Sequence, residues 1–242
     1  MRLEREGTTA WIRWERPGRL NAFDSAALAA LGDLLAEAGR SDARAIVCFG
    51  EGGAFSAGDD LRETATSTPE QWAEAIEGFN RLTREIVAVP QPVIAAVDGV
   101  CVGGSFEFAY ACDVRVTTPR SRFGCPEVAI GLSISNGFSL LLPRAARRLV
   151  LTGELVGADE ALRLGLVDLV AEDAEAEARG IAERLATLAP LAVAGSKRLL
   201  DDARRDALER EARLCRELFA TADAREGLAA FLEKREPRFS GR

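Results

Sequence analysis

The chain has 242 residues, of which 48% are hydrophobic and 29% are charged, enough for one large globular domain or a domain with a helical appendage. Its formal net charge of −7 argues against broad nucleic-acid binding, because neutralising phosphates requires a basic face. The sequence contains no histidine, which removes the usual Ser-His-Asp hydrolase triad. Carboxylates are therefore the leading candidates for acid–base chemistry.

The N-terminal segment and the cysteines both favour a cytoplasmic protein. Residues 1–6 lack the apolar core of a signal peptide, and no apolar run approaches the roughly 18 residues of a membrane helix. The cysteines are odd in number, form no C-x-x-C pair and have no histidine to complete a zinc site. We expect reduced thiols within the core, no metal and no membrane partner.

The first half of the chain alternates strands and helices. The elements expected in order are a strand at 9–15, a helix at 24–38, a strand at 45–49, a helix at 69–89, a strand at 93–97, a helix at 105–112 and a strand at 114–117. Pro17-Gly18 marks a turn, and Pro69 marks the first turn of a helix that Pro90 and Pro92 end. This alternation predicts an α/β protein with parallel strands joined by right-handed crossovers.

From about Asn136 onward the pattern becomes almost wholly helical, with an interruption at 167–170. The stretch 172–231 is rich in Ala, Leu, Arg and Glu with apolar residues at helical spacing. We expect this last third to be a helical appendage that packs on the core or on another subunit, and not on a membrane.

Two glycine-marked turns, 53–61 and 99–107, are the most informative feature of the chain. Together they can offer two backbone N–H groups to one substrate oxygen, which is the arrangement of an oxyanion hole. Gly103-Gly104 lies between an apolar strand and a helix, so the N–H of Gly104 can point outward at the positive helix end. The competing interpretation of the double glycine is a tight strand-to-helix turn with no chemical role.

Two glutamates follow these turns. Glu107 lies three residues after Gly104, close to one helical turn, and its alternative role is to cap the helix. Glu127 follows Pro126 at a turn, where a carboxylate is usually solvated or capping. If the two glutamates converge on one pocket, burial and mutual repulsion separate their pKa values into acid and base roles.

Several motifs, in the same order along the chain, resemble those of the crotonase superfamily, also called the enoyl-CoA hydratase/isomerase family. They are residues 16–22 (R-P-x-x-L-N-A), 53–61 (A-F-S-A-G-x-D-L), 96–107 (A-x-x-G-x-x-x-G-G-x-x-E), 123–131 (F-x-x-P-E-x-x-x-G) and 226–239 (E-G-x-x-A-F-x-E-K-R-x-P-x-F). The resemblance implies a crotonase-like α/β fold in which repeated ββα units form a spiral core. It assigns residues 1–190 to this core with its CoA-thioester site, and 191–242 to a C-terminal helical region for trimerisation and closure of the CoA pocket.

Carried over position by position, the resemblance implies that the N–H groups of Asp59 and Gly104 hold the thioester carbonyl and its enolate. Glu107 and Glu127 become the paired acid–base residues. The side chain of Asp59 is expected to be free to point away, since its N–H does the work. The residues implied in binding CoA are Arg19, Leu20, Ala57, Asp60 and Leu61, joined by Phe231 and Lys234 of the C-terminal helix, in some cases across a subunit boundary of a homotrimer or homohexamer.

The implied reaction is reversible addition of water across the 2,3 double bond of a 2-enoyl-CoA, with no cofactor beyond the CoA of the substrate. A polarised thioester makes Cβ electrophilic, so one glutamate can activate water while the other delivers a proton to Cα. Residues 134–138 depart from the P-G-A-G-G-like run of many hydratases, being bulkier and more polar. This departure keeps open an enoyl-CoA isomerase, a specialised acyl-CoA dehydratase and a non-catalytic acyl-CoA-binding subunit. Acyl chain length, substituents and pathway stay open as well.

Overall fold

The computed structural model describes residues 1–16, 18–201 and 205–239, so Pro17 of the predicted turn lies outside the described residues. Within them, the larger of two sheets has the strand order β1-β2-β3-β5-β7-β10. Its strands are β1 (Arg2–Glu6), β2 (Thr9–Trp14), β3 (Ala45–Gly50), β5 (Val93–Val97), β7 (Val114–Thr117) and β10 (Leu169–Val170). Neighbouring strands from β2 to β10 pair in parallel, and β1 pairs antiparallel with β2.

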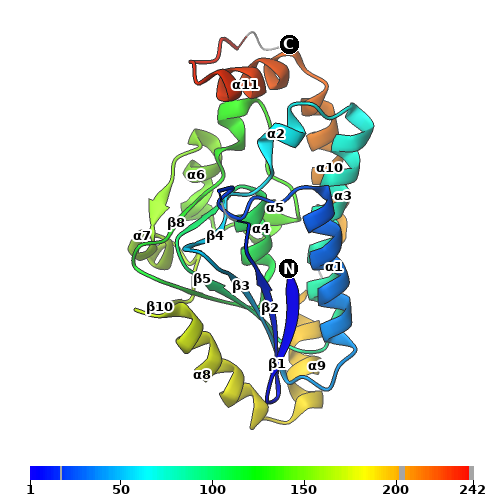
Figure 1. The fold of residues 1–242 in the computed structure, drawn as a ribbon, viewed down its shortest axis with the longest axis vertical. Coiled ribbons are helices and arrows are strands. Elements are labelled where there is room, and N and C mark those ends of the chain that lie inside the picture. Colours follow the sequence, from blue (N-terminus) through cyan, green and yellow to red (C-terminus); the bar gives the residue numbers. More distant parts are fainter. Residues whose placement is uncertain (17, 202–204, 240–242) are drawn as a thin grey trace.

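Helices cover both faces of this sheet (Figure 1). Helices α1 (Ser25–Gly39) and α3 (Pro69–Ala88) lie on one side, and α8 (Ala174–Ala186) lies on the other. Side chains alternate along the strands, so that Ile12 and Cys48 join the cluster with α1 and α3, whereas Trp11 and Val47 pack with α8. Burial on both faces explains why the predicted parallel strands are continuous apolar runs.

A smaller sheet prepares the candidate site. It contains β4 (Ala54–Ser56), β6 (Val100–Val102), β8 (Arg122–Gly124) and β9 (Val156–Gly157). Strands β4, β6 and β8 run parallel, and β9 pairs antiparallel with β8. Their parallel direction brings the carboxyl ends of β4, β6 and β8 to the same edge of the sheet. Helix α4 (Gly104–Ala111) follows β6 and is buried along its whole length.

Most of the remaining helices lie beside the smaller sheet or extend the fold at the C-terminal end, whereas α9 lies at the opposite end of the molecule (Figure 1). Helix α10 packs against α3, and α11 packs against the 3-10 helix η1. The stacked rings of Trp72 on α3 and Phe219 on α10, with centroids 5.0 Å apart, join the C-terminal helices to the core. The bounds of these elements are α2 (Leu61–Thr64), η1 (Pro126–Ile130), α5 (Phe138–Leu141), η2 (Arg144–Ala146), α6 (Arg147–Thr152), α7 (Ala158–Arg163), α9 (Pro190–Asp201), α10 (Arg205–Phe219) and α11 (Ala222–Glu233).

The structure confirms the alternating elements predicted between residues 9 and 117, with ends that agree closely, and the mainly helical final third. One interpretation needs correction, and one strand of the larger sheet had no predicted counterpart. The segments 53–61 and 99–107 are not turns alone, because they contain the short strands β4 and β6. Strand β1 was not predicted, since its sequence is mostly charged. It lies at the sheet edge, where its charged side chains form ion pairs and Leu3 packs against the core.

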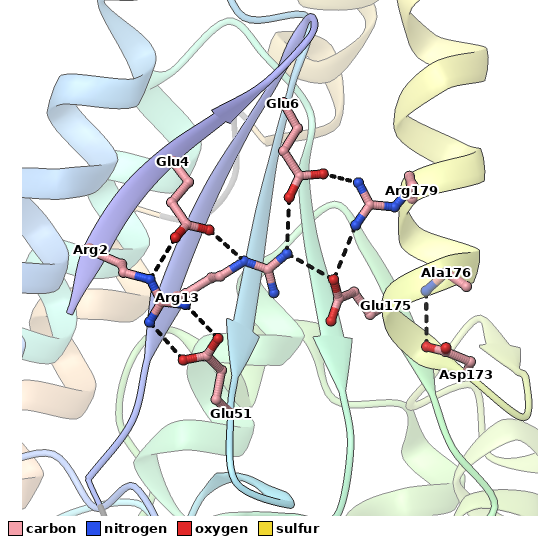
Figure 2. A network of polar contacts seen from close by, with 9 residues as sticks. All are labelled: Arg2, Glu4, Glu6, Arg13, Glu51, Asp173, Glu175, Ala176 and Arg179. Carbon is pink, nitrogen blue, oxygen red and sulfur yellow. Dashed lines mark hydrogen bonds and ion pairs between the residues drawn. The ribbon is translucent and has the colours of Figure 1, made fainter.

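A network of ion pairs joins this edge strand to α8 (Figure 2). The buried guanidinium of Arg13 on β2 lies within 3.2 Å of carboxylate oxygens of Glu4, Glu6 and Glu175. It also lies 4.3 Å above the ring of Trp11. Because Arg13 has partners on both β1 and α8, it holds the hairpin and the helix to the same sheet.

Among the helices that the structure describes, none combines the length and apolar character needed to cross a membrane. All five cysteines are buried free thiols, as expected from the sequence.

Candidate active site

A cavity of about 60 Å³ opens where β4, β6 and β8 end, room for a few water molecules. Ligands in parallel sheets commonly bind beyond the carboxyl ends of the strands, as they would here. One wall is apolar and comes largely from α3. The other carries the predicted polar groups, and the lining residues are Ala57, Asp59, Leu61, Trp72, Ile76, Phe79, Gly103, Gly104, Glu107, Pro126, Glu127, Ile130, Leu132, Ser133 and Ser135.

Glycines let the polypeptide backbone approach closely at this edge. Gly58 has a φ of +83°, and a Cβ atom added to it would lie 2.7 Å from Val102 O and 3.4 Å from Gly104 N. Gly103 has a φ of +61°, and its added Cβ would lie 3.0 Å from Glu127 Oε1. Only glycine tolerates both the left-handed backbone and these distances. The glycines therefore bring three loops, after β4, β6 and β8, into contact.

The N–H groups of Asp59 and Gly104 are both available to a ligand. The Phe23 N–H donates to Gly58 O, and the Asp60 N–H donates to Phe23 O, so the N–H of the intervening Asp59 faces the opposite side. Gly104 is the first residue of α4, where an N–H has no partner within the helix. Neither N–H donates to another residue in the described part of the chain. The predicted pair of donors is thus present on adjoining loops.

The start of α4 is fastened to the end of β4. Ser105 Oγ lies 2.7 Å from Ser56 O and 2.8 Å from Val102 O. Ser105 is completely buried, so these contacts are shielded from water. They fix the separation between the Asp59 loop and Gly104.

Glu107 projects from α4 and is 2% exposed. The backbone N–H of Ser135 lies 3.0 Å from Glu107 Oε1, and Ser135 Oγ lies 2.7 Å from Glu107 Oε2. The capping interpretation does not account for these contacts, because Ser135 belongs to a loop distant in sequence. Two donors on one carboxylate favour its ionised form.

Glu127 has a different environment. It is the second residue of η1, its Oε1 faces Gly103, and its Oε2 is buried with no hydrogen-bond partner in the described residues. Burial, reinforced by the charge of Asp59, raises the pKa of Glu127 to about 8. Glu127 is therefore mostly protonated at neutral pH, whereas the Glu107 carboxylate accepts hydrogen bonds from Ser135. The two glutamates have the separate environments expected of an acid and a base.

Asp59 brings a carboxyl group as well as an N–H to this part of the site. Asp59 lines the same cavity as both glutamates. Burial, together with the charge of Glu63, raises the pKa of Asp59 to about 7, although its own N–H partly offsets this. Three carboxyl groups consequently share one cavity, and none of its lining residues within the described chain carries a positive charge.

The residues implied in CoA binding fall into two groups. Ala57 and Leu61 line the cavity, and the neighbouring segment is joined to them by Ala57 N–H donating to Leu20 O at 2.9 Å and by an Arg19–Asp60 ion pair at 2.9 Å. The second group lies on the C-terminal helix. Phe231 is 54% exposed, and Lys234 ends α11 in a left-handed conformation. These two residues do not line the cavity of their own chain.

Sequence reasoning missed several lining residues. Ser135 was noticed only as part of an unusual segment, because its contact with Glu107 joins positions far apart in sequence. Trp72, Ile76 and Phe79 of α3 also line the cavity. Their spacing on one helical face was the available signal, although it equally fits an ordinary core face.

A model of the family described as enoyl-CoA hydratase/isomerase matches residues 4–242. The chain belongs to this family. Among curated members, it is 36% identical to the short-chain-enoyl-CoA hydratase of Clostridium acetobutylicum, over 97% of this chain and 95% of that protein. It is 35% identical to cyclohexa-1,5-dienecarbonyl-CoA hydratase of Thauera aromatica, over 99% and 96% of the two chains.

The family fold is equally clear in solved structures. The enoyl-CoA hydratase/isomerase from Pseudoalteromonas atlantica superposes with a TM-score of 0.88 at 32% identity, covering 99% of each chain. The predicted crotonase-like α/β fold is therefore confirmed.

Proposed function

We propose that the protein is an enoyl-CoA hydratase that adds water reversibly across the 2,3 double bond of a 2-enoyl-CoA. The observation that carries this proposal is the meeting of Glu107 and Glu127 at one cavity, beside the N–H groups of Asp59 and Gly104. Relatives named as hydratases, similar over nearly their full length, support it.

The two N–H groups would act on the thioester carbonyl. As the carbonyl oxygen gains charge, donors already in place stabilise it without reorganisation, and the positive end of α4 adds to the effect. This polarisation makes Cβ electrophilic and stabilises the enolate that forms. Loss of one such donor costs about 2.7–4 kcal/mol of activation free energy in enzymes where it has been measured.

The glutamates would divide the proton transfers. The Glu107 carboxylate takes a proton from water as the water oxygen bonds to Cβ. Protonated Glu127 then gives its proton to Cα as the enolate returns to a thioester. After the reaction Glu107 carries a proton and Glu127 lacks one, so a net proton transfer between them restores the starting state. The raised pKa of Glu127 supports its role as the acid.

Residues at and beside the cavity would bind CoA. We assign its binding to Arg19, Leu20, Ala57, Asp60 and Leu61. Leu20 lies beside the cavity and is 59% exposed, so its side chain is accessible to a bound ligand. No cofactor beyond the CoA of the substrate is required by this chemistry.

Phe231 and Lys234 would reach a CoA site across a subunit boundary of a homotrimer or homohexamer. Exposed leucines on α9 support association between copies, with Leu191 at 88% and Leu200 at 83% exposure. In this arrangement the division at residue 190 separates the site-bearing core from the region for assembly. The five buried thiols support a cytoplasmic location, because reduced cysteines are typical there.

The test is the loss of conjugated-thioester absorbance when the purified protein meets crotonyl-CoA. We expect fast loss for the wild type and a reduction of about 10²–10⁴-fold in Glu107→Gln and Glu127→Gln. Glu177→Gln is the matched control, since Glu177 is exposed on α8. Circular dichroism checks that each variant is folded.

Other outcomes identify the alternatives. Turnover of a 3-enoyl-CoA without hydration of crotonyl-CoA would indicate an isomerase that needs one mobile base. Tight binding of CoA thioesters without turnover, unchanged by Glu107→Gln, would indicate a binding subunit. Either result would overturn the proposed hydration.

A further inference from the structure

A third carboxyl group, that of Asp59, stands next to the candidate oxyanion hole and has no part in the proposed proton transfers. Asp59 supplies one of the two N–H donors, and it lines the cavity together with Glu107 and Glu127. Its own N–H also lowers the pKa of its carboxyl group, which partly offsets the effect of burial. The Asp59 N–H, which would donate to the substrate, and the carboxyl group that can accept from it therefore belong to the same residue.

An ionised Asp59 would oppose the reaction in two ways. Its carboxylate would compete with the thioester oxygen for the Asp59 N–H. It would also place a negative charge beside the enolate, inside a cavity where screening by water is weak. A neutral carboxyl has neither effect, and its O–H can donate to the same oxygen. A carboxylic acid kept neutral at an oxyanion site is an established device in other enzymes.

The surroundings of Asp59 favour the neutral form. Glu107 on α4 and Glu127 on η1 line the same cavity as Asp59, and the charge of Glu63 on α2 raises the pKa of Asp59. The residues of α3 at the cavity are apolar.

Two arginines of the neighbouring segment are engaged by other acids. Arg19 pairs with Asp60 at 2.9 Å, and Arg16 pairs with Asp24 at 2.6 Å and approaches Asp60 at 3.7 Å. In the described chain, no positively charged side chain lines the cavity to stabilise an Asp59 carboxylate.

We propose that Asp59 is a further catalytic residue, whose neutral carboxyl group joins its own N–H and that of Gly104 in binding the thioester oxygen. This inference rests on the proposed hydration. It adds that two carboxyl groups, Asp59 and Glu127, must both carry a proton for turnover. Asp59 keeps its proton throughout, donating a hydrogen bond only, so the proton balance of hydration is unchanged.

The pH dependence of kcat/KM for crotonyl-CoA tests this directly. Because two protons must be retained, log(kcat/KM) of the wild type should fall at alkaline pH with a limiting slope of about −2, beginning near pH 7. Asp59→Asn and Asp59→Ala should each give a slope of about −1, since Glu127 alone remains. A wild-type slope of −1, or a slope of −2 kept in Asp59→Asn, would overturn the proposal.

Substitution of Glu63 provides a second test, and it leaves the lining of the cavity unchanged. The charge of Glu63 raises the pKa of Asp59 from outside the site, where Glu63 bonds to Ser25. Glu63→Gln should therefore move the alkaline fall to lower pH. The same substitution in an Asp59→Asn background should not move it. A shift of equal size in both backgrounds would contradict the assignment to Asp59.

Binding of acetoacetyl-CoA separates this inference from the proposed reaction. Its enolate absorbs in the near ultraviolet and places an oxyanion in the hole without turnover. From about pH 6 to pH 9, wild-type affinity for the enolate should fall at least about tenfold further than that of Asp59→Asn. Parallel titrations would overturn the role of Asp59. Absence of crotonyl-CoA hydration with divergent titrations would overturn the hydratase proposal alone.

Discussion

Ser135 donates two hydrogen bonds to the carboxylate of Glu107. Its N–H lies 3.0 Å from Oε1, and its hydroxyl lies 2.7 Å from Oε2. Both residues are nearly completely buried, with Ser135 at 5% and Glu107 at 2% exposure. A buried carboxylate held by two donors keeps one orientation, which is what a base must have to meet a water molecule.

Removing the hydroxyl tests this relationship. Ser135→Ala keeps the N–H and deletes the shorter contact, whose loss is worth about 1.5–3 kcal/mol for a charged acceptor. We expect kcat for hydration to fall by about tenfold or more, with a smaller change in KM, because the base loses orientation while the CoA contacts stay. Steady-state kinetics with crotonyl-CoA measure the changes in kcat and KM. A change below about twofold in kcat would show that the N–H alone positions Glu107.

A pair of glycine substitutions tests the close packing at the site. A Cβ atom at Gly104 would lie 2.6 Å from Cζ of the buried Phe79 ring, whereas one at Gly180 on α8 meets nothing within 4 Å. Gly104→Ala should lower the unfolding free energy by about 1–3 kcal/mol and reduce activity. Gly180→Ala, in a helix interior, should raise it by about 0.5–1 kcal/mol. Urea unfolding measures both, and equal effects would contradict the packing argument.

The network in Figure 2 predicts unequal roles for two arginines. The Arg13 side chain is 7% exposed, whereas that of Arg2 is 47% exposed. Arg2→Ala should cost less than about 1 kcal/mol, as expected of surface ion pairs. Arg13→Ala should cost about 3 kcal/mol or more, because it breaks a buried charge network and a contact with Trp11. Thermal or urea unfolding of both variants gives the comparison, and similar losses would refute it.

Protein stability should decrease as pH rises from about 4.5 to about 8. In this interval the unfolded chain has lost the proton of Glu127, whose ordinary pKa is 4.5, while the folded protein retains it up to its raised pKa of about 8. The folded state then binds more protons, so unfolding becomes easier with increasing pH. Glu127→Gln should flatten this dependence, and the exposed Glu177→Gln should not. Urea midpoints at pH 5 and pH 8 measure the difference. The same fall in all three proteins would contradict it.

The regular elements were predictable because their signals are local. The apolar runs of β3 and β5, the Pro69 start of α3 and the prolines after it act through neighbours in sequence. Strand β1 gave no such signal, since its charged side chains are satisfied by Glu51 and Arg13, which reach it only after folding. Strands β4 and β6 are three residues long and were hidden within glycine-rich segments.

The sequence by itself determined the order of elements, the family and the identities of Glu107, Glu127, Asp59 and Gly104 as candidates, since motifs record which residue types stand at which spacing. Only the tertiary structure decided how these groups are used. The parallel pairing of β4, β6 and β8 brings their ends together, Ser135 engages Glu107, and Asp59 lines the same cavity as both glutamates. Protonation depends on burial and neighbouring charge, which are properties of three-dimensional packing between segments distant in sequence.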